Sequence, residues 1–236
     1  MKKKKKILVS ITTTSNWPEK VKEIDELELK EVAIFPTTLI LRGRKMLYGL
    51  LEKTKLVSIP HAHLRDDYES WELDYLTRKY KTEVFNIHPT KAAVEFIKNN
   101  RNYKDRIFLE NLIVIPDNFS EILNQGGGVC LDLSHWEDFG VLQKGISYRN
   151  FEKILKIYKI GGNHISAIRQ RKYEYCDLIE KINSIRYNDH YLRKLSELGY
   201  VKKYKSYLAD IISIELENPL REQLKVKKYL KKILNL

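Results

Sequence analysis

The residues best suited to chemistry lie at the end of a short apolar stretch, residues 128–135 (GVCLDLSH). Three glycines, residues 126–128, lead into this stretch, Asp132 lies near the end of its apolar run, and His135 follows three residues later. A buried parallel strand is almost wholly apolar, so a carboxylate near its C-terminal end indicates an active site at that edge. Oxygen and nitrogen donors that converge there would suit a divalent metal ion.

The same arrangement recurs along the chain. Five of the six histidines end or follow a predicted strand, and the sixth lies in the connection after the seventh strand; they are His61, His63, His88, His135, His164 and His190. Glu110 and Glu215 close the fifth and eighth predicted strands in the same way. A single histidine at such a place is more often a core or loop residue than a ligand, but the whole set favours a metal site.

The hydrophobic pattern supplies the elements that would position these residues. The predicted strands are residues 5–13, 31–36, 56–62, 83–88, 106–110, 129–133, 161–165 and 211–217. Helical patterns fall at residues 18–29, 43–53, 68–80, 89–100, 119–123, 151–158, 192–198 and from 219 onward. We expect Asn16 to cap the first helix, Pro18 and Pro89 to lie in first turns, and a long polar connection to follow the seventh strand.

Strands and helices that alternate at a spacing of roughly thirty residues predict an α/β fold, a (β/α)8 TIM barrel. A doubly wound open sheet is the alternative. Polar donors at the ends of the third to eighth strands favour the barrel, because they suggest a ring that converges on one centre. Neither GxGxxG nor GxxxxGK[ST] occurs, so nothing supports a nucleotide cofactor.

Composition limits the class of protein. The 236 residues, 43% of them hydrophobic, suit one globular domain, residues 1–236, with residues 1–6 as a basic N-terminal overhang. No apolar run approaches the roughly 18 residues of a membrane span, and we expect a cytoplasmic protein.

Cys130 and Cys176 form no zinc-binding CxxC pair. The net charge of +12 permits nucleic acid as a partner, but solvated lysine-rich surfaces explain it as well. The composition does not indicate an oligomeric state.

Four short motifs together resemble the xylose isomerase-like TIM-barrel superfamily. They are LEN at residues 109–111, DLSH at 132–135, NHIS at 163–166 and SIELENP at 213–219. They occur in order over nearly the whole chain. The superfamily contains sugar and sugar-phosphate isomerases and epimerases, and also endonuclease IV.

The ketose 3-epimerase branch implies one metal held by Glu, Asp, His and Glu from strands five to eight. The matching positions are Glu110, Asp132, His164 and Glu215. This donor set suits Mn²⁺, Co²⁺, Mg²⁺ or Zn²⁺. Glu217 competes with Glu215, because residues two apart on a strand face the same way, but the SIExExP pattern favours Glu215.

In that branch, the histidine of the Asp-x-x-His motif and an arginine after the strand-seven histidine contact substrate. His135 matches the first. Arg169 is near the second but one residue from the usual spacing. The resemblance therefore implies that His135 and Arg169 act with Glu110 and Glu215 in catalysis.

The endonuclease IV branch uses three zinc ions and more histidines. Its Gly-x-Cys-x-Asp-Thr-Cys-His signature resembles residues 128–135, with departures at Leu133 and Ser134. His63, His88 and His190 match its extra ligands, and His61 is a further candidate. Residues 166–169 depart from its Asn-Asp-Ser-Lys signature, its Asp-x-His pair is displaced to residues 188–190, and its first signature is absent at residues 61–63.

Three hypotheses follow. The first is a metal-dependent isomerase or epimerase of a sugar or sugar phosphate, in which Glu110 and Glu215 transfer a proton and His135 and Arg169 steady the oxyanion. The second is a multinuclear zinc phosphodiesterase that cleaves abasic DNA. The third is a barrel that binds a metal or sugar without turnover.

Overall fold

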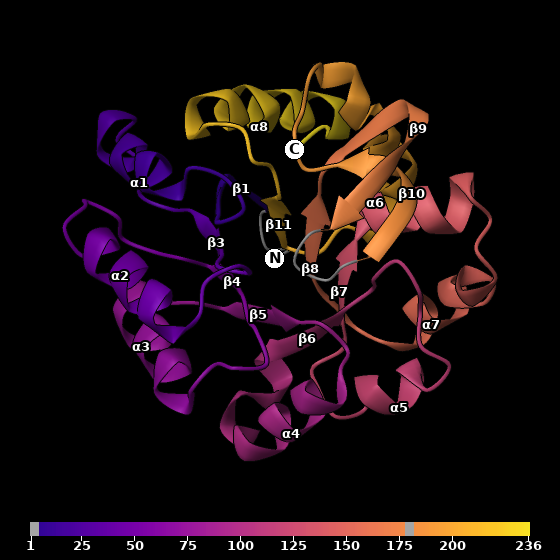
Figure 1. Cartoon of the computed structure of the whole chain (residues 1–236), viewed down its shortest axis with the longest axis horizontal. Coiled ribbons are helices and arrows are strands. Elements are labelled where there is room, and N and C mark those ends of the chain that lie inside the picture. Colours follow the sequence, from indigo (N-terminus) through magenta and orange to yellow (C-terminus); the bar gives the residue numbers. More distant parts are fainter. Residues whose placement is uncertain (1–4, 178–181) are drawn as a thin grey trace.

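The computed structural model describes residues 5–177 and 182–236. Its main sheet is a parallel barrel with the strand order β1-β11-β8-β7-β6-β5-β4-β3-β2 (Figure 1). The two ends of this order, β1 (Lys6–Leu8) and β2 (Ser10–Thr12), are separated only by Val9, so one extended stretch pairs with β11 on one side and β3 on the other. The expected TIM barrel is therefore confirmed.

The remaining barrel strands follow the expected order, but β4 begins five residues later than the expected strand at residues 56–62. They are β3 (Ala33–Phe35), β4 (His61–His63), β5 (Val84–Ile87), β6 (Ile107–Glu110), β7 (Val129–Asp132), β8 (Ile160–Ile165) and β11 (Ile211–Ile214). The helices form a ring outside them: α1 (Trp17–Glu26), α2 (Leu41–Leu51), α3 (Ser70–Tyr80), α4 (Lys91–Asn99), α5 (Phe119–Leu123), α7 (Phe151–Ile157) and α8 (Leu220–Leu234) (Figure 1). No helix of the described residues is long and apolar enough to span a membrane.

The helix starts differ in detail from the expected ones. Pro18 does lie in the first turn of α1, but the Asn16 side chain makes no capping hydrogen bond. The placement of Pro89 in a first turn was wrong, because α4 begins at Lys91. Thr90 caps α4 instead, and its hydroxyl accepts a hydrogen bond from the backbone N–H of Ala93 at 3.0 Å.

The largest departure from expectation follows β8. The expected polar connection is an antiparallel hairpin of β9 (Ala167–Asp177) and β10 (Ile182–Asp189), which form a sheet separate from the barrel (Figure 1). The helical segment expected at 192–198 is a 3₁₀ segment over Leu195–Tyr207. Shorter 3₁₀ segments cover Arg101–Arg106 and Ile146–Tyr148.

Glycine is required at two positions where β8 approaches its neighbours closely. Gly128 has a φ of +127°, and an added Cβ would lie 2.2 Å from the carbonyl oxygen of Lys159, where β8 begins. Gly161 faces Phe108 inside the barrel, and an added Cβ would lie 2.2 Å from the aromatic ring. A side chain at either position would push β8 away from its neighbours.

Candidate metal centre

The side chains that point into the barrel change from apolar to polar toward the C-terminal ends of the strands. Phe35, Val84, Phe108, Cys130 and Ile211 belong to one buried cluster inside the barrel. Because strand side chains alternate, the residue two positions after each of the last four also points inward. These residues are Asn86, Glu110, Asp132 and Ser213, all buried.

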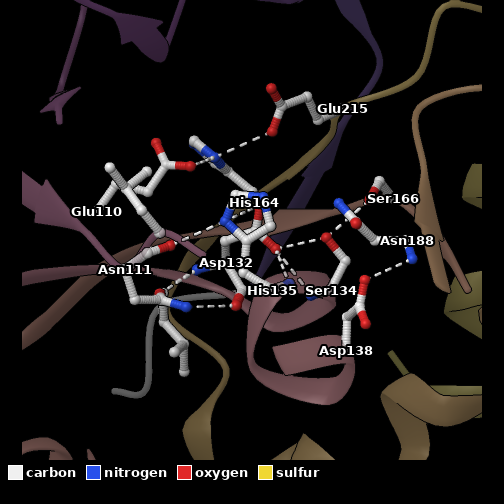
Figure 2. A network of polar contacts seen from close by, with 12 residues as sticks. Glu110, Asn111, Asp132, Ser134, His135, Asp138, His164, Ser166, Asn188 and Glu215 are labelled. Atoms are coloured by element: carbon white, nitrogen blue, oxygen red, sulfur yellow. Dashed lines mark hydrogen bonds and ion pairs between the residues drawn. The ribbon is translucent and has the colours of Figure 1, made fainter. Parts of the chain in front are cut away.

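Four expected ligands meet at this end of the barrel. Glu110 ends β6, Asp132 ends β7, His164 lies near the end of β8, and Glu215 follows β11. Each offers one ligand atom, and these atoms all lie within 4.8 Å of one another. Nδ1 of His164 lies 3.3 Å from a carboxylate oxygen of Glu110 and 3.2 Å from one of Glu215 (Figure 2). We call these four residues the metal-ligand cluster.

Three atoms of the metal-ligand cluster are buried without a hydrogen-bond partner among the described residues. They are Oδ2 of Asp132, Nδ1 of His164 and Oε2 of Glu215. Buried polar atoms are nearly always paired, and leaving one unpaired is costly. Two carboxylate oxygens and one imidazole nitrogen within one cluster are donors that a divalent cation would satisfy. The residues therefore fit a metal ion.

The other carboxylate oxygen of Asp132, Oδ1, stabilises the turn that follows β7. Oδ1 accepts hydrogen bonds from the backbone N–H groups of Ser134 and His135, at 2.7 and 2.9 Å, and from the Ser134 hydroxyl at 2.6 Å. Asp132 thereby caps the turn α6 (Leu133–His135), which continues as a π-helical segment over Trp136–Leu142. This division leaves Oδ2 as the oxygen of Asp132 without a hydrogen-bond partner among the described residues.

The charges of the metal-ligand cluster are arranged around His164. Burial works against a charged imidazole, but Cys130, Glu110 and Glu215 raise the pKa of His164 well above its usual value. Burial would also raise the pKa of both carboxyls, yet His164 holds that of Glu110 well below its usual value and that of Glu215 at about 2. Without metal, one imidazolium lies between two carboxylates. A divalent cation could replace the imidazolium proton there.

A chain of hydrogen bonds from Ser213 through His61 and Asn86 orients the Glu110 carboxylate. Nδ1 of His61 accepts from the Ser213 hydroxyl at 2.7 Å, and Nε2 of His61 donates to Oδ1 of Asn86 at 3.0 Å. The amide nitrogen of Asn86 then donates to Oε2 of Glu110 at 2.6 Å. Both nitrogens of His61 are thus engaged. This favours an orienting role for His61, although His61, Cys130 and His164 also lie close enough to form a group of metal-ligand type.

A second cluster, consisting of His63, His88 and Glu110, lies beside the first and shares Glu110 with it. Nδ1 of His63 donates to the carbonyl oxygen of Leu64 at 2.8 Å, which leaves Nε2 facing Oε2 of Glu110 at 3.1 Å. Burial and the neighbouring His63 lower the pKa of His88 to about 4, so His88 is a neutral imidazole at neutral pH. The second cluster therefore also offers donors that suit a cation.

Comparison with known proteins rests on structure, since the sequence matches no protein-family model and no curated protein. A xylose isomerase-like TIM barrel protein from Mycobacterium smegmatis, solved in complex with magnesium, aligns over 97% of this chain and 96% of its own, with a TM-score of 0.54 and 13% identity. A xylose isomerase domain protein from Planctomyces limnophilus aligns over 98% of both chains, with a TM-score of 0.53 and 10% identity. This chain has the xylose isomerase-like TIM-barrel fold.

Other expected site residues of this xylose isomerase-like barrel lie near the metal-ligand cluster. Nδ1 of His135 donates to the carbonyl oxygen of Asn111 at 2.9 Å and lies 3.6 Å from Oδ2 of Asp132, so Nε2 of His135 is left for another partner. Nδ1 of His190 lies 3.9 Å from Oε1 of Glu215. Both histidines border the metal-ligand cluster without belonging to it.

One expected residue, Arg169, bonds to residues outside the metal-ligand cluster, and another, Glu217, is not part of that cluster. Arg169 donates to Asp189 at 3.0 Å and to Glu197 at 2.8 Å, and so ties the hairpin to the segment that follows it. Its contact with substrate stays a prediction. The structure brings Glu215, and not Glu217, into the metal-ligand cluster.

Several residues that support the site were not predicted from the sequence, because their side chains are amides and hydroxyls and not His, Asp or Glu. Asn111 accepts from the backbone N–H of Asp132 at 2.8 Å and donates to its carbonyl oxygen at 2.9 Å. The Ser166 hydroxyl donates to that of Ser134 at 2.7 Å. The LEN and NHIS motifs contained Asn111 and Ser166, so their places in those motifs were the available signal.

Proposed function

We propose that this chain is a divalent-metal-dependent enzyme that isomerises or epimerises a sugar or sugar phosphate. The observation that carries the proposal is the placement of two ionised carboxylates, Glu110 and Glu215, on two sides of one metal-ligand cluster (Figure 2). Ionised carboxylates are proton acceptors, and two of them around one substrate carbon can take a proton and return it. Mn²⁺, Co²⁺, Mg²⁺ and Zn²⁺ all suit the donor set, and the neighbour from Mycobacterium smegmatis was solved with magnesium.

Each residue of the site has a separate role in the proposed reaction. A bound metal would polarise the substrate carbonyl and so acidify the adjacent C–H. Glu110, held by Asn86, and Glu215 lie in the same cluster, so one carboxylate can accept this proton while the other, after taking a proton from solvent, returns one to the carbon. His135 has a raised pKa, despite its burial, because of nearby Asp132, and it would donate from Nε2 to the developing oxyanion.

The direct test is solvent-label exchange. Metal-loaded protein is incubated in deuterated water with a panel of ketoses and ketose phosphates, and deuterium in the sugar is measured by mass spectrometry. We expect wild-type protein to introduce deuterium next to the carbonyl of at least one sugar, and Glu110→Gln and Glu215→Gln to lose this exchange, because an amide is not a base. Glu217→Gln is the matched control and should retain it. Exchange that persists in both glutamine variants would contradict the proposal.

A zinc-dependent phosphodiesterase is the second candidate, and the second cluster favours it. Nδ1 of His63 is engaged with Leu64, and Nε2 lies 3.1 Å from a carboxylate oxygen of Glu110. An imidazole nitrogen and a carboxylate oxygen at this separation can bind the same cation. Two ions that share Glu110 would form a two-metal site suited to attack on phosphorus.

The measurement that separates the two functions uses a DNA duplex with one abasic site. The second candidate predicts nicking that falls steeply with added salt, because phosphate contacts release counterions. Nicking without deuterium exchange in any sugar would replace the first proposal by the second. If metal-loaded protein shows neither activity, the barrel binds its ligand without turnover.

A further inference from the structure

Asn188, in β10 of the hairpin, carries a buried amide that nothing in the fold uses. The residue is 1% exposed, and both the nitrogen and the oxygen of its side-chain amide lack a hydrogen-bond partner among the described residues. Apart from the Tyr80 hydroxyl, the other such atoms in the described chain belong to the metal-ligand cluster. A buried amide with both ends unpaired destabilises the folded state, so its presence calls for a reason.

The backbone holds Asn188 in this position. Its N–H donates to Oδ2 of Asp138 at 2.8 Å, and its carbonyl oxygen accepts from the Tyr173 hydroxyl at 2.7 Å. The next residue, Asp189, is fixed by Arg169 at 3.0 Å. These three contacts prevent the segment from shifting to satisfy the amide.

Asn188 lies beside the Asp132 side of the metal-ligand cluster. Asp189 pairs with Ala167, and Ala167 follows Ser166 at the end of β8. Ser166 donates to Ser134, and Ser134 donates to Oδ1 of Asp132. Figure 2 shows Asn188 next to Ser166 and Ser134, across the cluster from Glu110.

We propose that the side-chain amide of Asn188 binds a hydroxyl group of the substrate at the edge of the metal-ligand cluster. The inference rests on the proposed isomerase or epimerase function and narrows its substrate class. A hydroxyl donates one hydrogen bond and accepts others, which matches an amide that offers N–H and C=O together. A phosphate or carboxylate would satisfy the N–H but would place negative charge against the carbonyl oxygen. The amide therefore selects a polyhydroxylated part of the substrate.

The first test measures stability without turnover. Asn188→Leu replaces an unpaired amide by an apolar group of similar size, so we expect the melting temperature of the metal-loaded protein to rise by about 2–4 °C. The matched control is Asn163→Leu. Asn163 is equally buried, but its amide bonds Leu131, Tyr207 and Ala209, so this substitution should lower the melting temperature. A fall for Asn188→Leu comparable to that of Asn163→Leu would overturn the inference.

The second test measures polyol binding by the same proteins, loaded with Mn²⁺. D-Ribulose, D-fructose and xylitol are added, and the shift in melting temperature is recorded. We expect at least one of them to stabilise wild-type protein, and Asn188→Leu to lose at least half of that shift while keeping the stabilisation by Mn²⁺ alone. Equal shifts in both proteins, or no shift in either, would overturn the inference. Protection that depends on Asn188 without deuterium exchange would instead reject the proposed reaction and leave the inference standing.

Discussion

The carboxylates of Glu110 and Glu215 approach the same ring nitrogen, Nδ1 of His164, at 3.3 and 3.2 Å. They come from β6 and from the residue after β11, which are separated in the barrel by β7 and β8. One imidazole ring therefore lies within ion-pair distance of two carboxylates that come from different parts of the barrel. This relationship is the basis of the metal proposal.

Metal binding is expected to release a proton. The pKa of His164 is raised well above its usual value, so the metal-free imidazole is protonated near neutral pH and must lose this proton to become a ligand. Metal affinity should therefore rise with pH until the pKa of His164 is passed. Calorimetric titration at pH 7 in buffers of different ionisation enthalpy should show close to one proton released per ion. His190→Ala should release the same number, and an affinity that is independent of pH would contradict the account.

The second cluster gives a prediction about stoichiometry. If the proposed isomerase or epimerase function is right, His88→Ala should leave tight binding at one ion per chain, because His88 belongs to the second cluster alone. Equilibrium dialysis followed by elemental analysis gives the number. A decrease from two ions in wild-type protein to one in His88→Ala would favour the phosphodiesterase.

Because of Lys20, the free energy of unfolding should rise with pH above about pH 8. Burial lowers its pKa to about 8, although Glu217 and Glu23 partly offset this, and Nζ donates to the Thr12 hydroxyl at 2.6 Å. Between about pH 8 and 10.5 the unfolded chain keeps a proton that the folded chain has lost. The cost of burying the charged Lys20 therefore disappears and the free energy of unfolding rises with pH, by up to about 3 kcal/mol.

Urea unfolding of wild-type protein and of Lys20→Met across this range tests the prediction. The difference between their free energies of unfolding should change in favour of wild-type protein as pH rises, while other titrating groups cancel. A difference that is constant between pH 8 and 10.5 would show that Lys20 does not titrate with a lowered pKa.

The ion pair of Arg44 and Glu72 should be sensitive to the loss of one partner. Both side chains are fully buried between α2 and α3, and two guanidinium nitrogens bind the carboxylate at 2.9 Å. Arg44→Ala leaves the buried Glu72 carboxylate without its cation, with hydrogen bonds only from Tyr48 and Glu69, and should cost about 3–5 kcal/mol in urea unfolding. The exposed Arg42→Ala is the control, with a change within about 0.5 kcal/mol. If Arg44→Met with Glu72→Leu is no more stable than Arg44→Ala, this account of the pair is wrong.

The sequence was most informative where side-chain direction follows from strand alternation. Glu110 and Asp132 end short apolar strands, and each lies two residues after an inward apolar neighbour, so their meeting at one end of a barrel was predictable. The hairpin was not predictable. In β9, Tyr173 and Tyr175 alternate with charged residues on a ribbon that lies outside the barrel, where few positions are buried and the hydrophobic signal is weak.

Asn188 was also beyond the reach of sequence reasoning. Its position depends on the hairpin register and on the hydrogen bond that its backbone N–H donates to Asp138, and both are tertiary features. A search for His, Asp and Glu near strand ends passes over an amide. Arg169 shows the opposite case, because its spacing suggested substrate contact while the fold pairs it with Asp189 and Glu197.

The central claim is that Glu110, Asp132, His164 and Glu215 hold a divalent metal ion, and metal binding by Asp132→Asn tests it most directly. Asparagine keeps an oxygen to cap α6 but replaces the unpartnered Oδ2 by an N–H₂ group, so the fold should survive while the ligand is lost. Loss of an outer hydrogen-bond partner typically costs 10–100-fold in affinity, so loss of a ligand should exceed about 100-fold. In a titration with Mn²⁺ or Zn²⁺, we expect about one tight ion per chain for wild-type protein and none for Asp132→Asn, with unchanged circular dichroism. Equal affinity in the two proteins would contradict the account.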